Sequence, residues 1–238
     1  MSDVNLVIKK LVIANRILAA EGVVDAYGHI SVRNPGNPKR YFLACSRAPE
    51  LVTVADIMEF EMDGTAVDAK GRKPYLERYI HGALYESRPE VNSVVHNHAR
   101  EVVPFSVSKT TLRPIAHVCG RIGHHIPVWD IRDKFGDTDL LVVNMEQGHD
   151  LARCVGNNVA ALMRGHGAVA TGPAIEETVL TAIYLMVNAR MQMDAMRLGE
   201  VTYLSRGEIE KTLTQPKVGT ERAWEYLTSR VGLSIDQL

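Results

Sequence analysis

His96 and His98 stand two residues apart at the end of the short apolar run formed by residues 93–95. Side chains two apart on a strand project to the same side, so both imidazoles could bind one ion. Neutral imidazole suits zinc, manganese, iron or nickel, and a catalytic site needs a third and often a fourth ligand. Glu77, expected on a helix just upstream, and His166, which lies between two glycines, are the candidates. Three imidazoles and a carboxylate would form a metal site that also contains a general acid or base.

Each of these signals has a structural alternative when it is taken alone. A pair of histidines on an apolar strand can arise by chance or through core packing. A pair such as Glu77 and His81, four residues apart, is more often part of a solvated helix face. The glycines beside His166 favour a functional role, because they let the backbone approach a ligand closely. The combination, rather than any one motif, therefore predicts the metal site.

The composition excludes several other kinds of protein. The 238 residues are 46% hydrophobic, which is enough for a sizeable core, and they carry a formal net charge of -1. This charge gives no reason to expect nucleic acid or an anionic membrane as a partner. The three cysteines are widely spaced, and no segment resembles a signal peptide or a membrane span. We expect a soluble, cytoplasmic protein with reduced thiols.

Strand and helix patterns alternate along the chain. Apolar periodicity predicts helices over residues 4–21, 75–87, 101–107, 146–155 and 175–198, and strands over residues 29–33, 41–45, 57–62, 91–96, 126–129 and 159–163. No repeat or linker marks a domain boundary, and no element is predicted within the tail, residues 199–238. The pattern predicts a single α/β layered domain, residues 1–238, around a mixed sheet.

Taken together, the motifs resemble the class II aldolase/adducin family, which includes fuculose-phosphate aldolase and ribulose-phosphate epimerase. The similarity runs from about residue 5 to residue 200. The similar segments are Ala14-Asn15-Arg16, Gly28-His29-Ile30-Ser31, the hairpin of residues 56–64, Glu77 with His81, His96-Asn97-His98, and Gly165-His166-Gly167. The resemblance implies a central mixed, largely antiparallel sheet flanked by helices. It also implies a divalent ion held by His96, His98 and His166 with Glu77 on or beside it, and a homotetramer with active sites at subunit interfaces. The tail, about residues 199–238, could pack on a neighbouring subunit.

The departures from the family pattern concern its phosphate loops, which are rich in small hydrogen-bonding residues. His29 replaces the asparagine of the first loop, Cys45-Ser46-Arg47-Ala48 replaces the second, and Pro74-Tyr75-Leu76-Glu77 replaces the third. A phosphate would lose several hydrogen bonds, each worth roughly 1.5–3 kcal/mol. Tyr75 and Leu76 instead offer flat apolar surface, and Arg47 and His29 could pair with a carboxylate. Ser46 belongs to the same candidate substrate site, and an internal or intersubunit ion pair is the alternative role for Arg47.

These departures resemble the decarboxylase branch of the family, which acts on hydroxylated aromatic or dienoate carboxylates. The resemblance implies one divalent ion per subunit, Mn²⁺ or Zn²⁺ with Fe²⁺ or Co²⁺ as alternatives, acting as the electron sink at an oxygen ortho to the departing carboxylate. Glu77 would carry the proton to the ring carbon. If Glu77 is instead a tight metal ligand, water or another histidine would be the acid. Among His117, His124 and His125, His124 is the catalytic candidate, and Tyr203 in the tail could enter a neighbour's site.

Two other functions stay open at this point. An aldolase or epimerase acting on an unphosphorylated carbonyl compound would use the same ion and would release an aldehyde or ketone instead of CO2. A noncatalytic, adducin-like binding domain is the second alternative. The presence of all four presumed metal residues argues against it.

Overall fold

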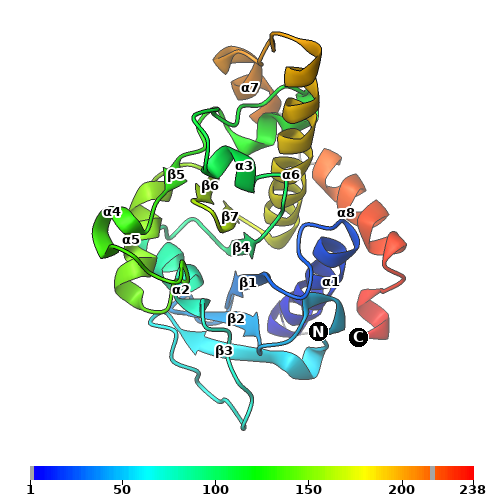
Figure 1. Cartoon of the computed structure of the whole chain (residues 1–238). Coiled ribbons are helices and arrows are strands. Elements are labelled where there is room, and N and C mark those ends of the chain that lie inside the picture. Colours follow the sequence, from blue (N-terminus) through cyan, green and yellow to red (C-terminus); the bar gives the residue numbers. More distant parts are fainter. Residues whose placement is uncertain (1–2, 215–217) are drawn as a thin grey trace.

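A single seven-stranded sheet organises the protein (Figure 1). The computed structural model describes residues 3–214 and 218–238. Every neighbouring pair of strands is antiparallel except the last, and the order is β3-β2-β1-β4-β7-β6-β5. The strands are β1 (His29–Arg33), β2 (Arg40–Ala44), β3 (Ile57–Glu61), β4 (Ser93–Asn97), β5 (Val128–Trp129), β6 (Ala160–Met163) and β7 (Gly167–Gly172). The predicted mixed, largely antiparallel sheet is therefore confirmed.

Helices cover both faces of this sheet (Figure 1). On one side α1 and α6 pack on the sheet and α8 packs against both, while α2 and α5 pack together on the other side. Short helices and 3-10 turns complete the layers near the β5 edge and in the connections. The helices are α1 (Asp3–Ala20), α2 (Arg78–Ser87), α3 (Val103–Ser106), α4 (Arg132–Phe135), α5 (Met145–Val155), α6 (Ile175–Leu198), α7 (Arg206–Leu213) and α8 (Val218–Arg230). The 3-10 turns are η1 (Pro49–Leu51), η2 (Val54–Asp56), η3 (His117–Ile122) and η4 (Ile235–Gln237).

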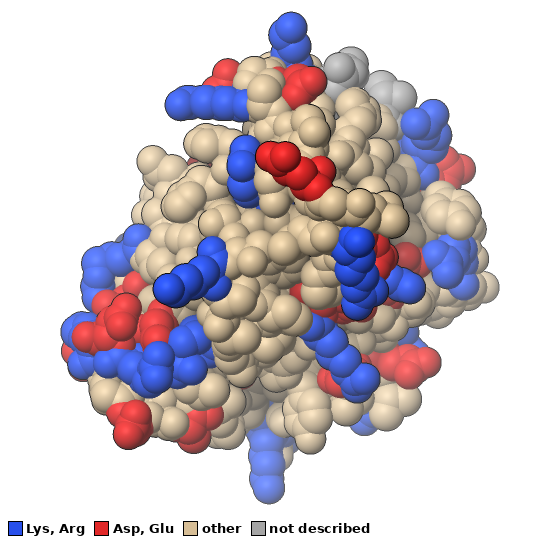
Figure 2. Space-filling view, turned by 45° about the horizontal axis from the view of Figure 1, so that its top comes forward, with Lys and Arg blue, Asp and Glu red and all other residues tan. Residues whose placement is uncertain are grey.

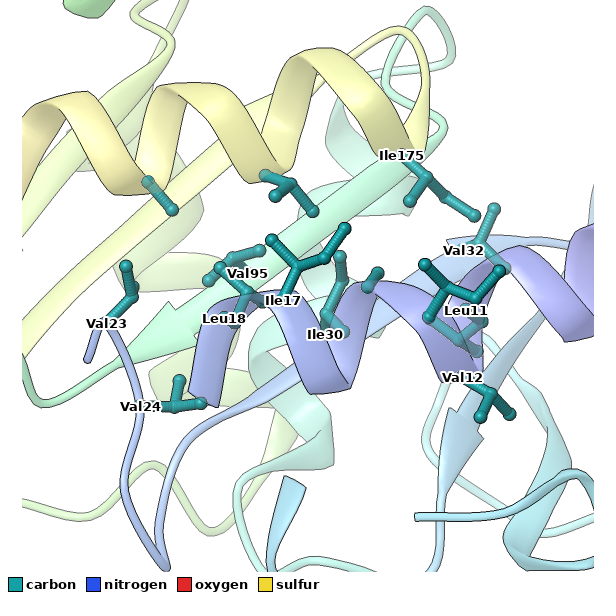
Figure 3. Close-up of a cluster of buried hydrophobic side chains, with 14 of the residues drawn as sticks. Leu11, Val12, Ile17, Leu18, Val23, Val24, Ile30, Val32, Val95 and Ile175 are labelled. Carbon is teal, nitrogen blue, oxygen red and sulfur yellow. The ribbon is translucent and has the colours of Figure 1, made fainter. Parts of the chain in front are cut away.

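The core on the α1 side shows why the sheet can support a polar site. Figure 3 shows Ile17 and Leu18 of α1 lying over Ile30 of β1 and Val95 of β4. These four side chains are at most 1% exposed. Burying each one stabilises the fold by roughly 1.5–3 kcal/mol. We therefore expect apolar packing, and not a bound ion, to dominate stability.

Three sequence predictions differ from the structure in instructive ways. The helix predicted from residue 75 begins at Arg78, because residues 74–77 are held elsewhere: Pro74 bridges to Cys45, and the Tyr75 carbonyl accepts a hydrogen bond from the Arg78 side chain. Strand β7 was not predicted, since its glycine and alanine residues give no periodic signal. The tail forms α7 and α8 and packs on its own chain, where Leu227 joins the α1 core.

The surface carries charges of both signs. On the face in Figure 2, positive and negative side chains are intermixed around a mostly uncharged central area. Within residues 3–214 and 218–238, every helix falls short of the length or the apolar character needed to cross a bilayer.

Candidate metal centre

Strand β4 delivers the first two histidines. His96 is fully buried in the strand, directly opposite His29 of β1, and His98 follows the strand end and is partly exposed. Both imidazoles turn to the same side, as expected for residues two apart, and their Nε2 atoms are 3.0 Å apart.

The third histidine comes from the tight turn between β6 and β7. His166 places its Nε2 atom 2.9 Å from Nε2 of His98. Gly165 has a positive φ of 66°, which glycine adopts freely, and its N–H donates to the Ser106 hydroxyl. A Cβ atom on Gly167 would lie 2.0 Å from the Asn97 carbonyl oxygen. The missing side chain of Gly167 thus lets β7 approach β4 closely. The sequence had instead suggested that the glycine lets the backbone approach a ligand.

Glu77 closes the group from the N-cap position of α2. Its Oε1 atom accepts a hydrogen bond from the Val142 N–H at 3.1 Å. Its Oε2 atom lies 3.3 Å from Nε2 of His96 and 3.5 Å from Nε2 of His166. Burial raises the pKa of this carboxyl, but the facing imidazoles of His96 and His166 outweigh it and hold the pKa well below its usual range. Glu77 is therefore a carboxylate at neutral pH.

Backbone carbonyl groups orient two of the three imidazoles. Nδ1 of His96 donates to the Ala168 carbonyl at 3.2 Å, and Nδ1 of His166 donates to the Leu140 carbonyl at 3.0 Å. A carbonyl oxygen can only accept, so in each neutral ring the hydrogen is on Nδ1 and the lone pair is on Nε2. Leu140 itself has a positive φ of 69°, an uncommon conformation for a branched residue. The chain here is held in a strained form that supports His166.

The resulting donor set fits a divalent ion. One ligand atom from each of Glu77, His96, His98 and His166 lies within 4.8 Å of the others. Burial, together with His96 and His166, lowers the pKa of His98 to about 4, so this ring is neutral as a ligand must be. Unprotonated nitrogens this close repel one another unless a proton or a cation lies between them. Three imidazoles and one carboxylate suit zinc, manganese, iron or cobalt.

The predicted substrate residues form a second group beside the ion site. His29 is 4% exposed, and its ring centroid lies 5.2 Å from that of His96 and 4.5 Å from that of Tyr75. The Tyr75 hydroxyl donates to the Arg47 carbonyl. Arg47 donates through Nε to the Leu51 carbonyl at 2.8 Å and lies 3.4 Å from Asp56, so the internal ion pair considered from the sequence is present.

The other members of that group differ in exposure. Ser46 follows Cys45 on the same loop and is exposed. The Leu76 side chain is 63% exposed. Both residues therefore face solvent at the edge of the site rather than its interior.

Two further predicted residues lie away from the ion site within one chain. His124 is exposed after η3, and in the described part of the chain no hydrogen bond or ring contact joins it to the four ligand residues. Tyr203 stacks against Arg113, with the guanidinium 4.1 Å from the ring centroid, and its hydroxyl accepts from Gln192 at 3.3 Å. A role for either residue in a neighbouring subunit's site stays a prediction.

A cavity of about 410 Å³ reaches the ligand group at His98. Its lining combines the apolar end of α1 with charged side chains, and it includes Asp25, Glu50, Arg100 and Glu101. The volume falls in the range of pockets that bind small molecules. Of the four converging residues, His98 is the one that lines this cavity.

Sequence reasoning assigned no role in the site to three residues that lie behind it. Ser31, His81 and Tyr85 are buried and are connected by hydrogen bonds to His29. The sequence does contain a signal for this cluster. His29 and Ser31 are two apart and share one face of a strand, while His81 and Tyr85 are four apart and share one face of a helix. Reading both periods together would have predicted that these side chains meet.

Comparisons with known proteins show which family and fold the chain shares. The family model described as "Class II Aldolase and Adducin N-terminal domain" matches residues 9–193. The chain is 34% identical over 239 residues to "Decarboxylase tropJ" of Talaromyces stipitatus, covering 90% of each chain. It is 28% identical over 230 residues to a 3,4-dihydroxyphthalate decarboxylase of a Terrabacter species, covering 92% of this chain and 94% of the relative. An aldolase II superfamily protein from Pseudomonas syringae superposes with a TM-score of 0.80 at 23% identity, covering 97% of this chain and 94% of the other, which shows a shared fold.

Proposed function

The chain belongs to the class II aldolase and adducin family, and from this premise we propose that it is a divalent-metal-dependent decarboxylase of a hydroxylated aromatic carboxylate. Two relatives that cover about nine tenths of the chain are named decarboxylases, which supports an enzyme of the carboxy-lyase type. The name of one of them includes a dihydroxylated aromatic dicarboxylate, and this supports the substrate class.

The observation that carries the proposal is the convergence of three Nε2 atoms and one carboxylate oxygen within 4.8 Å. A divalent cation held there would supply a Lewis acid for the negative charge that develops on a substrate oxygen when CO2 departs. His96 and His166 present lone pairs because backbone carbonyls bind their opposite nitrogens, so the site is oriented before any ligand arrives. We propose one ion per subunit, Mn²⁺ or Zn²⁺, with Fe²⁺ or Co²⁺ as alternatives.

The neighbouring residues are proposed to bind the substrate. The Tyr75 ring offers a flat surface beside His29. The two terminal amino groups of Arg47 have no hydrogen-bond partner in the described chain, so they can bind a carboxylate while Nε stays on Leu51. Arg47→Ala should raise KM for a dicarboxylate roughly tenfold and change kcat little. An unchanged KM would leave Arg47 with only its ion pair to Asp56.

Proton delivery to the ring carbon has two candidate routes. The depressed pKa of Glu77 favours a role as ligand and as proton acceptor over a role as the acid. Water would then supply the proton, or His124 would do so from a neighbouring subunit. The second route requires an oligomer, and we propose the homotetramer implied by the family resemblance. Light scattering on the purified protein tests this assembly. The proposed location is the cytoplasm, because all three cysteines are free thiols.

The function is tested by incubating zinc- or manganese-loaded protein with ortho-hydroxy aromatic mono- and dicarboxylates and measuring CO2. The same acids without the ortho hydroxyl, and protein stripped of metal, are the controls. We expect CO2 only when the ion and the ortho hydroxyl are both present. Release of an aldehyde or ketone from an unphosphorylated aldol would identify an aldolase, and no turnover of any acid in the panel would refute the decarboxylase.

A further inference from the structure

Four buried polar side chains form an unbroken hydrogen-bonded row that ends beside the metal centre. The Tyr85 hydroxyl lies 2.7 Å from the Ser31 hydroxyl, which lies 2.6 Å from Nδ1 of His81. Nε2 of His81 lies 2.6 Å from Nδ1 of His29. None of the four residues is more than 4% exposed. Buried polar groups cost stability unless each is satisfied, so the direction of every hydrogen bond in this row matters.

The direction follows from the end of the row. Tyr85 makes its hydrogen bond to Ser31, and no other acceptor for its hydroxyl is present in the described chain. Burial raises the pKa of Tyr85 far above its usual value, so the hydroxyl keeps its proton and must donate it to Ser31. Ser31 then donates to Nδ1 of His81, and Nε2–H of His81 donates to Nδ1 of His29. The reverse direction would leave a fully buried hydroxyl without an acceptor.

This direction sets the tautomer of His29. Its Nδ1 atom accepts a hydrogen bond, so the single hydrogen of the neutral ring is on Nε2. Because Nδ1 accepts a hydrogen bond, the ring cannot carry a second hydrogen and is neutral. Nε2 has no hydrogen-bond partner in the described chain, and the rings of Tyr75 and His96 lie beside the His29 ring.

We propose that Tyr85, Ser31 and His81 are positioning residues that fix His29 as a neutral Nε2–H donor, directed at an anionic substrate oxygen beside the metal centre. The carboxylate or ring oxygen of a hydroxylated aromatic acid has the required chemistry, and this identification rests on the proposed function. The same tautomer prevents His29 from becoming another metal ligand, because neither of its nitrogens has a free lone pair.

The test combines ¹⁵N NMR of zinc-loaded, histidine-labelled protein with kinetics. In the unmodified protein we expect both His29 and His81 to carry hydrogen on Nε2, with His29→Asn used to assign the resonances. Ser31→Ala and Tyr85→Phe should give mixed tautomers at His29 and lower kcat/KM roughly tenfold at unchanged zinc content. Ser31→Thr keeps the hydroxyl and should restore both. Tyr41→Phe is the matched control, because Tyr41 is equally buried but donates to the Arg78 carbonyl outside the row.

Coupling gives a second measurement that a purely structural role would not produce. In the His29→Asn background, Ser31→Ala should have no further effect on kcat/KM, since the row then has no ring to orient. Hydrogen on Nδ1 of His29 in the unmodified protein would overturn the proposal, as would wild-type tautomers in Ser31→Ala. If no acid is decarboxylated, the proposed function fails while the tautomer measurement still decides whether the row has this direction.

Discussion

The sharpest prediction concerns the stabilisation that a divalent ion gives through His98. Nε2 of His98 lies 3.0 Å from Nε2 of His96 and 2.9 Å from Nε2 of His166, so it is central to the donor set. Its Nδ1 atom makes no hydrogen bond in the described chain, and the residue is partly exposed. His98→Ala should therefore remove one ligand at little cost to the fold.

The size of the effect can be worked out from linkage. An ion at 100 times its Kd stabilises a folded protein by about 2.7 kcal/mol. For a chain of this size each kcal/mol raises Tm by about 2–4 °C, so zinc should raise Tm by about 5–11 °C. If losing one ligand weakens binding roughly 100-fold, the same zinc concentration stabilises His98→Ala by only about 0.4 kcal/mol, or about 1–2 °C.

Thermal unfolding with chelator and then with excess zinc measures both shifts. His149→Ala is the matched control, because His149 is a surface histidine paired with Glu86, away from the ligand group. The control should keep the full zinc-induced shift. The same shift in His98→Ala as in the unmodified protein would show that zinc binds elsewhere and would refute the ligand assignment.

Three further predictions test other parts of the account. Glu77→Gln should lower turnover at least 100-fold while the three imidazoles retain ion, as measured by CO2 release beside metal analysis; unchanged turnover would exclude Glu77 from the mechanism. Gly167→Ala should lower the free energy of unfolding, measured in urea, by about 3 kcal/mol, because its Cβ would meet the Asn97 carbonyl. Gly219→Ala, at an exposed position of α8, should raise that free energy by about 0.5–1 kcal/mol, and equal effects of the two substitutions would contradict this reasoning. Burial, and after it the facing His96, lower the pKa of His81 from 6.5 to about 3. Between these two pH values the unfolded chain binds more protons than the folded one, so the free energy of unfolding falls as pH drops from 6.5 to 3. His81→Gln should show a smaller loss of unfolding free energy between pH 7 and pH 5, and an equal loss would show that His81 does not titrate in this way.

The sequence predicted most of the fold because apolar periodicity records which face of each element is buried. The helix α6 was predicted at its observed bounds, and strand β1 was predicted residue for residue. The failures share a cause. In β7, small residues fit between close neighbouring strands, so the constraint is tertiary and leaves no local period. The same holds at residues 74–77, where contacts with Cys45, just after β2, and with Arg78 of α2 override the predicted helix start at residue 75.

The candidate ligands could be predicted from residue type and spacing, but their support could not. The loop that ends at Val142 supplies the Leu140 carbonyl to His166 and the Val142 N–H to Glu77. These are backbone groups, which every residue possesses, so no sequence pattern marks them. The uncommon backbone conformation at Leu140 is likewise visible only in three dimensions. The main-chain hydrogen bonds that orient the proposed metal ligands therefore cannot be predicted from the sequence.

The group that faces Nδ1 explains how His96, His166 and His29 can lie close together and still act differently. At His96 and His166 the group facing Nδ1 is a carbonyl, an acceptor, so the lone pair is placed on Nε2 and the ring can bind a cation. At His29 the group facing Nδ1 is the N–H of His81, a donor, so Nε2 carries hydrogen and the ring can bind an anion. His29 can thus lie beside the metal centre without competing for the metal, because its Nε2 presents an N–H. The Ser31 hydroxyl is two hydrogen bonds away from His29 in this row. Through His81 it decides whether the His29 ring binds an anion or a cation.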